Sequence, residues 1–346
     1  MNPLIWALLI TSLSTGTIIT MMSHHWLLAW LGLELNTLSI LPVIMKTHHP
    51  RATEAATKYF ITQTSAAALI LFASTITAWQ TGHWSITSSP PPQATIIMTL
   101  ALMLKLGAAP THLWYPEILQ GTTMNIALNI ATWQKIAPIT LLLLLQNHLS
   151  TLLLLLAGLI STLVGGFTGL NQTQTRKIMA FSSIAHMGWL MVTLPLAPHL
   201  TTLTLIIYII MTIATFTSLN TTTLKTFTDT NAAWTYSPTL LTLTMLSLMS
   251  LGGLPPLTGF MPKLLILNSL VMKNLAPLGT ILALASLPSL FFYIRLAYLT
   301  MLTNPPNNTN TKYNWRFKPP QQQSTTITMA LSIMLLPTTP LLYLAT

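Results

Sequence analysis

The chain has 346 residues, of which only 5% are charged, and its mean hydropathy is +0.64. A soluble domain carries about 25% charged residues, so most of this surface does not face water. The chain contains no cysteine, which excludes disulfides, thiolate metal sites and iron–sulfur ligation. The net charge of +10 does not indicate nucleic-acid binding, because no polar segment is long enough to form a basic soluble domain.

Long apolar runs recur along the whole chain and predict an all-α polytopic membrane protein. The runs are continuous, whereas the strands of a membrane barrel alternate between apolar and polar residues. Most of them can cross about 30 Å of hydrocarbon as a helix. We predict about eleven transmembrane helices, at residues 3–22, 25–45, 53–79, 93–109, 124–145, 150–170, 176–195, 199–223, 238–272, 277–301 and 324–345.

The first apolar run decides how the N-terminus is interpreted. It has no basic segment before it, no small-residue cleavage site after it and no Arg-rich amphipathic pattern of a mitochondrial presequence. We therefore expect residues 3–22 to be kept as the first span.

Basic residues are distributed unequally between the two predicted membrane faces. Lys273 alone lies on one face, and the other face, which holds the N-terminus, carries nine. The positive-inside rule places the richer face in the cytoplasm, or in the matrix of a mitochondrion, so the N-terminus is expected inside and the C-terminus outside. The nine are Lys46, Arg51, Lys58, Arg176, Lys177, Lys225, Lys312, Arg316 and Lys318.

Four charged residues, Glu34, Lys105, Lys135 and Lys263, fall within predicted spans, away from the ends that long side chains can reach. Insertion scales assign about 2.5–3.5 kcal/mol to each lysine at the centre of a membrane helix. A single Lys–Glu pair can lock two helices together, but one carboxylate cannot neutralise three lysines. We therefore interpret at least some of these lysines as neutral or hydrated groups that handle protons. Arg295 lies closer to a span end, where its side chain is expected to reach the headgroups.

Two predicted spans are interrupted by Gly and Pro beside one of these lysines. Lys105 precedes a break at residues 107–110, and Lys263 follows a break at residues 252–262. Interrupted helices at matching places in two halves of a chain point to an ion site. We expect the freed backbone carbonyls, together with water, to give each lysine partners at mid-depth.

The positions of the two breaks also predict an internal repeat within a single membrane domain. The interrupted spans are each the fourth helix of a five-helix unit, in residues 1–145 and 150–301, and a final helix follows at 324–345. A five-helix unit crosses the membrane an odd number of times, so its repeat is expected to be inverted.

Two histidines near the spans are secondary candidates for a proton relay. His112 follows the first break and either relays protons or caps the broken helix, and His186 either relays protons or hydrogen-bonds another helix. No histidine pair has metal-binding spacing within a helix, so no metal site is predicted. Glu54, Glu117 and Asp229 lie near the inner face and are expected to be solvated.

Several segments resemble a known family over the whole chain, the antiporter-like, proton-pumping membrane subunits of mitochondrial NADH:ubiquinone oxidoreductase, or respiratory complex I. The segments are KLGAAPTHLWYPEILQGTT, TWQKIAP, RKIMAFSSIAHMGW, GGLPPLTGFMPK, MNPLIWALL, HWLLAWLGLELN and HHPRATEAATKYF. Thr111 and Tyr115 stand where the family carries apolar residues, and no departure falls on a charged position.

The resemblance implies a role for each buried charge and a set of partners. Glu34 and Lys105 would form the carboxylate–lysine pair, Lys135 would be the central lysine, and Lys263 the residue of the second broken helix. It also implies that this chain binds no cofactor, because NAD, FMN, iron–sulfur clusters and ubiquinone are held by other subunits. The expected partners are the other membrane-arm subunits, including antiporter-like siblings, and membrane lipid, in particular cardiolipin, in the inner mitochondrial membrane.

Two other classes of function stay open on the sequence. A stand-alone cation/proton antiporter shares the broken helices and buried charges, but it would need an oxygen cluster to dehydrate Na⁺, and the spans supply only Glu34. A passive membrane scaffold leaves the lysines within the spans unexplained.

Overall fold

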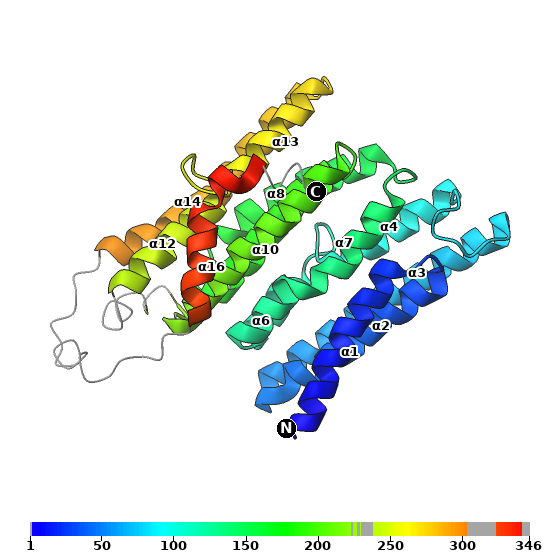
Figure 1. The fold of residues 1–346 in the computed structure, drawn as a ribbon, viewed down its shortest axis with the longest axis horizontal. Coiled ribbons are helices and arrows are strands. Elements are labelled where there is room, and N and C mark those ends of the chain that lie inside the picture. Colours follow the sequence, from blue (N-terminus) through cyan, green and yellow to red (C-terminus); the bar gives the residue numbers. More distant parts are fainter. Residues whose placement is uncertain (1, 223, 227–228, 230–237, 303–322, 341–346) are drawn as a thin grey trace. The chain divides into compact units, whose positions relative to one another are not determined.

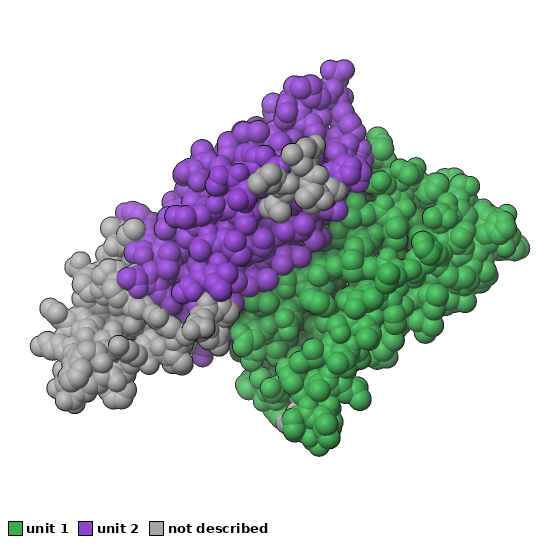
Figure 2. Space-filling model, in the orientation of Figure 1, with its two compact units in different colours: residues 1–158 green, residues 159–346 purple. Residues whose placement is uncertain are grey.

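The computed structural model describes residues 2–222, 224–226, 229, 238–302 and 323–340. These residues form helices and connecting loops, and the only β-pairing within them is two isolated bridges. The chain divides into two compact units, residues 1–158 and 159–346 (Figure 2), which we call unit 1 and unit 2.

Unit 1 is a bundle in which consecutive helices pack side by side, α1 on α2, α2 on α3 and α3 on α4 (Figure 1). Gly32 brings α1 and α2 together, since a Cβ there would meet Thr20 Cγ2 at 2.6 Å and the Gly16 carbonyl oxygen at 2.9 Å. The helices are α1 Pro3–Met22, α2 Trp26–Ile44, α3 Pro50–Thr81, α4 Pro92–Leu106, α5 Trp114–Gly121, α6 Met124–Ala131 and α7 Trp133–Leu145, and α8 Thr151–Gly169 continues into unit 2.

Contacts between loops define the two ends of unit 1. At one end, the Lys46 Nζ lies 4.4 Å from the centroid of the Trp6 ring, which joins the start of α1 to the link after α2. At the other end, His25 and Ser85 form a bridge and the His25 ring stacks on Trp84 with centroids 5.9 Å apart. The helices therefore alternate in direction, as the predicted spans require.

Unit 2 contains a second set of packed helices, with α10 against α12, α13 and α16. Thr175 Oγ1, at the start of α9, donates to the carbonyl oxygen of Leu224 at 2.8 Å, so the links before α9 and after α10 meet at one end. The helices are α9 Thr175–Thr193, α10 Pro198–Thr221, α12 Pro238–Gly252, α13 Phe260–Met272, α14 Ala276–Leu302 and α16 Gln323–Met334, with a 3₁₀ turn at Leu336–Thr338.

The observed helices follow the predicted spans, with four differences. The helix α5, Trp114–Gly121, lies outside every predicted span. The second break covers residues 253–259, because Pro262 fits within the first turn of α13, where no intrahelical N–H is needed. The span predicted at 124–145 is divided at Thr132 into α6 and α7. The last helix ends at Met334, since Pro337 follows, whereas the span was predicted to reach residue 345.

The membrane class rests on helix length and apolarity. In the described part of the chain, seven helices are long and apolar enough to cross a membrane, and four further apolar helices are shorter. One of the predicted inner-face basic residues can be compared with the N-terminus directly, because Lys46 and the start of the N-terminal helix share one end of unit 1. Lys312, Arg316, Lys318 and residues 341–345 of the last predicted span lie outside the described residues.

Candidate functional site

Lys105 lies in the last turn of α4, next to the break that the sequence predicts. Gly107 ends the helix in the left-handed conformation, with φ 69°, which glycine adopts without strain. The Lys105 side chain is 5% exposed, and within the described residues its Nζ has no hydrogen-bond partner. A buried ammonium without a partner is costly, so this group is poised to lose its proton or to acquire water.

The carbonyl groups at the end of α4 are bonded by other side chains. Trp114 Nε1 donates to the Leu104 carbonyl oxygen at 3.1 Å, and Gln63 Nε2 donates to the Lys105 carbonyl oxygen at 3.5 Å. The expectation that the freed carbonyls of this break would hold Lys105 is therefore wrong. Its Nζ forms no hydrogen bond with any carbonyl oxygen of the described residues.

Glu34 lies on α2 and is half-buried. Its Oε2 accepts a hydrogen bond from Thr37 Oγ1 at 3.2 Å. Glu34 and Lys105, both among the described residues, form no ion pair within 4.0 Å. The carboxylate is nevertheless close enough to act electrostatically on the Lys105 ammonium. The expected carboxylate–lysine pair is thus present as two side chains in the same unit without an ion pair between them.

Lys135 lies at the start of α7, three residues after the discontinuity at Thr132. Its side chain is 4% exposed. The Nζ lies 4.9 Å from the centroid of the Tyr115 ring on α5, which is within range of a cation–π contact. All three candidate lysines therefore lie within four residues of a helix interruption, although the sequence signalled only two of these interruptions.

Lys263 lies in the first turn of α13 and bonds across the second break. Its Nζ donates to the Gly252 carbonyl oxygen at 2.8 Å, at the end of α12. Here the expectation that the break supplies the lysine with a carbonyl partner is confirmed. Gly253 has φ 81°, and a Cβ at that position would lie 2.9 Å from the Lys263 Nζ. Glycine is therefore required for both the turn and the space.

A small cavity in unit 2 brings Lys263 together with one of the two candidate histidines. It has about 30 Å³ of room for water, enough for one or two molecules, and His186, Tyr208 and Lys263 are among its lining residues. The His186 and Tyr208 rings have centroids 5.6 Å apart. A hydrated cavity between a lysine and a histidine can carry a proton between them.

His112 has a different environment in the loop between α4 and α5. Its ring Nδ1 lies 3.3 Å from the carbonyl oxygen of Pro110 in the same loop. This contact lies within the loop and involves the ends of neither α4 nor α5. Glu34, Lys105 and Lys135 thus all belong to unit 1, whereas His186 and Lys263 line one cavity in unit 2.

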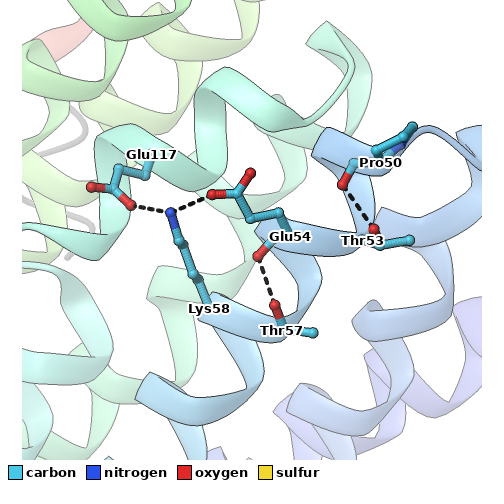
Figure 3. Close-up of polar contacts among 6 residues, drawn as sticks. All are labelled: Pro50, Thr53, Glu54, Thr57, Lys58 and Glu117. Carbon is cyan, nitrogen blue, oxygen red and sulfur yellow. Dashed lines mark hydrogen bonds and ion pairs between the residues drawn. The ribbon is translucent and has the colours of Figure 1, made fainter.

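The sequence did not predict a cluster of ionic residues at the end of unit 1. Lys58 Nζ lies 2.7 Å from both Glu54 Oε1 and Glu117 Oε2 (Figure 3). The spacing of Glu54 and Lys58 is typical of a helical ion pair, but nothing in the sequence indicates that Glu117 on α5 reaches the same lysine. The two glutamates are exposed, as expected, yet both are paired rather than only solvated.

Arg295 also forms a protein contact that the sequence did not predict. Its Nη1 donates to the carbonyl oxygen of Leu170 at 3.1 Å, just past the end of α8. The guanidinium therefore reaches a helix C-terminus, where a positive charge is favourable.

Comparisons with known proteins agree with a helical membrane protein. Residues 23–287 match the family described as NADH:quinone oxidoreductase/Mrp antiporter, TM, and residues 290–343 match the family described as NADH dehydrogenase subunit 2 C-terminus. NADH-ubiquinone oxidoreductase chain 2 of Aquarana catesbeiana is 51% identical over 344 residues, which cover 99% of this chain and 100% of the relative.

Two solved structures have similar folds. Respiratory complex I from Thermus thermophilus contains a chain with a TM-score of 0.81 and 23% identity, which covers 95% of this chain and 79% of that one. The Mrp complex of a Dietzia species contains a chain with a TM-score of 0.80 and 15% identity, which covers 97% of this chain and 76% of that one. At these identities the likeness concerns the fold.

Fold, breaks and buried charges together define an antiporter-type membrane protein of the NADH:quinone oxidoreductase and Mrp class. Within that class, similarity over nearly the full length distinguishes one group. The chain belongs to the NADH-ubiquinone oxidoreductase chain 2 family, and so to the membrane subunits of that enzyme.

Proposed function

We propose that this chain relays protons through its buried lysines as part of the membrane arm of NADH:ubiquinone oxidoreductase. The observation that carries the proposal is the placement of Lys105, Lys135 and Lys263, each buried or half-buried beside a helix interruption within an apolar helical bundle. Such lysines have a poorly stabilised charged form, so proton exchange with water or with one another is accessible to them. Glu34 sets the electrostatic environment of Lys105, and His186 extends the path from Lys263.

We further infer that the chain crosses the membrane eleven times and contains two five-helix units of inverted topology. The order of lysine and break supports the inversion, because Lys105 precedes its break and Lys263 follows its break. With nine basic residues on one face, the N-terminus lies in the matrix and the C-terminus on the intermembrane side of the inner mitochondrial membrane.

The partners follow from the family. The redox cofactors and ubiquinone belong to other subunits of the enzyme, and this chain contributes proton transfer in contact with neighbouring membrane subunits. The basic face also suits an anionic lipid such as cardiolipin, since juxtamembrane Lys and Arg attract acidic headgroups.

A stand-alone cation/proton antiporter is the alternative function. The likeness to the Mrp complex is consistent with it at the level of the fold. The relatives that are 50–51% identical to this chain over nearly its full length, however, are named as the oxidoreductase chain. Glu34 as a single carboxylate also offers too few oxygen ligands to strip water from Na⁺.

The relay is tested by replacing each buried lysine with methionine in the assembled enzyme reconstituted in liposomes. Lys105→Met, Lys135→Met and Lys263→Met should each keep assembly and lower the number of protons pumped per electron. Lys273→Met is the matched control, because Lys273 is exposed and bonds the carbonyl oxygens of Pro195 and Leu196. Wild-type pumping by all three assembled variants would contradict the relay.

A further inference from the structure

Three aromatic residues of unit 1 form a continuous cluster beside the first break. The Tyr59 ring on α3 packs edge-on against Trp114, with centroids 6.0 Å apart and planes at 68°. Trp114 packs edge-on against Tyr115, with centroids 5.5 Å apart and planes at 84°. Edge-to-face contacts fix the orientation of neighbouring rings more strictly than aliphatic packing does. We call Tyr59, Trp114 and Tyr115 the aromatic clamp.

The aromatic clamp contacts the helix segments that carry both lysines of unit 1. Trp114 Nε1 donates to the Leu104 carbonyl oxygen at 3.1 Å, one residue before Lys105. Tyr115 presents its ring to the Lys135 Nζ at 4.9 Å. The indole therefore fixes the end of α4, and the phenol ring lies against the ammonium at the start of α7.

Two hydrogen bonds connect the aromatic clamp to α7 and α2. Tyr59 Oη donates to Gln134 Oε1 at 3.4 Å, and Gln134 Nε2 donates to Asn36 Oδ1 at 3.0 Å. Gln134 immediately precedes Lys135 in α7. The clamp therefore contacts two neighbouring residues of α7, Gln134 through Tyr59 and Lys135 through Tyr115. Tyr59 and Asn36 are each 2% exposed, which makes these bonds difficult for water to replace. The turn of α7 that follows the discontinuity at Thr132 is thereby attached to α2 and α3.

We propose that the aromatic clamp positions the two lysines of unit 1, with the Tyr115 ring as the group that holds the Lys135 ammonium. The proposal rests on the relay function proposed above. A ring face stabilises a cation in a desolvated site without supplying a negative charge that would bind the proton permanently. Tyr115 is a positioning residue, because it would act on the proton path only through its contact with Lys135.

The test compares Tyr115→Phe with Tyr115→Leu in the assembled, reconstituted enzyme. Tyr115→Phe keeps the ring face and should pump as the wild type does. Tyr115→Leu removes the ring face and should slow proton pumping by about three- to tenfold at unchanged assembly. In the double variant with Lys135→Met, the change at Tyr115 should have no further effect, because a residue that acts through Lys135 is silent without it.

Each other outcome overturns a specific statement. Additive losses in the double variant, equal losses in the Phe and Leu variants, or wild-type pumping by Tyr115→Leu would overturn the clamp. Loss of assembly in Tyr115→Leu, with Tyr115→Phe intact, would assign the ring a packing role and also overturn it. Normal pumping by Lys135→Met alone would instead remove Lys135 from the relay, which is a failure of the proposed function.

Discussion

At the scale of single residues, the neighbours of each lysine determine its chemistry more than its depth does. Lys263 has a backbone carbonyl partner, Lys135 has an aromatic ring, and the Nζ of Lys105 has no hydrogen-bond partner within the described residues. The sequence shows all three as similar lysines in apolar runs. Three different environments instead imply three different proton affinities, which is what a directional relay needs.

Gly253 offers a sharp test of the Lys263 environment. In Gly253→Ala, the new Cβ would lie 2.9 Å from the Lys263 Nζ and the residue would keep a positive φ, so the lysine should be displaced from the Gly252 carbonyl. The backbone strain is of order 1–3 kcal/mol. We expect slower proton pumping and a lower melting temperature of the enzyme.

Gly82→Ala is the matched control for that experiment. Gly82 also has a positive φ, 75°, but no atom lies within 4 Å of the Cβ position. It should therefore show the strain without the displacement, with reduced stability and normal pumping. Equal pumping by the two variants would contradict the role of Gly253 in placing Lys263.

At the scale of helices, the sequence predicted where most helices lie and where two of them are interrupted. It did not predict the interruption at Thr132. Apolar runs locate the helices because lipid requires every backbone group to be bonded within its own segment. Glycine and proline marked the breaks after α4 and α12 because they change the allowed backbone conformation. The discontinuity at Thr132 has no such marker, because threonine is common inside membrane helices.

The candidate site was predictable to the same extent. Charge in an apolar run is visible in one dimension, so Glu34, Lys105, Lys135 and Lys263 were identified from the sequence. The aromatic clamp was not, because its three rings come from two helices and their mutual orientation depends on how those helices pack. The Lys58 bridge to Glu117 escaped prediction for the same reason.

The link between α3 and α5 can be tested by comparing the two partners of Lys58. Glu117→Gln removes the ion pair between the helices, whereas Glu54→Gln removes only the pair within α3 (Figure 3). Hydrogen exchange of the amides in Trp114–Gly121 should become faster in Glu117→Gln and stay unchanged in Glu54→Gln. The difference should shrink at high salt, since exposed ion pairs are screened. Equal exchange in both variants would show that Lys58 does not hold α5.

At the scale of the whole molecule, loop contacts within each unit bring together links that the charge distribution predicts on one membrane face. Lys46 meets Trp6 at one end of unit 1, and His25 meets Trp84 at the other. In unit 2, Thr175 meets Leu224 close to Lys225, so the basic links before α9 and after α10 also share an end. A membrane potential acts on every one of these charges in the same direction, which is why uneven charge sets topology for a chain that has almost no soluble surface.

This orientation is directly measurable because the chain contains no cysteine, so a single introduced cysteine reports one position. Lys46→Cys and His83→Cys form a matched pair, since both residues are exposed and they belong to opposite ends of unit 1. In sealed mitoplasts, a membrane-impermeant maleimide should label His83→Cys on this chain, while Lys46→Cys should react only after the membrane is permeabilised. The permeabilised sample also controls for shielding by neighbouring subunits. Labelling of Lys46→Cys in intact mitoplasts would reverse the topology, and it would place the basic face, with the Lys58 cluster, on the intermembrane side.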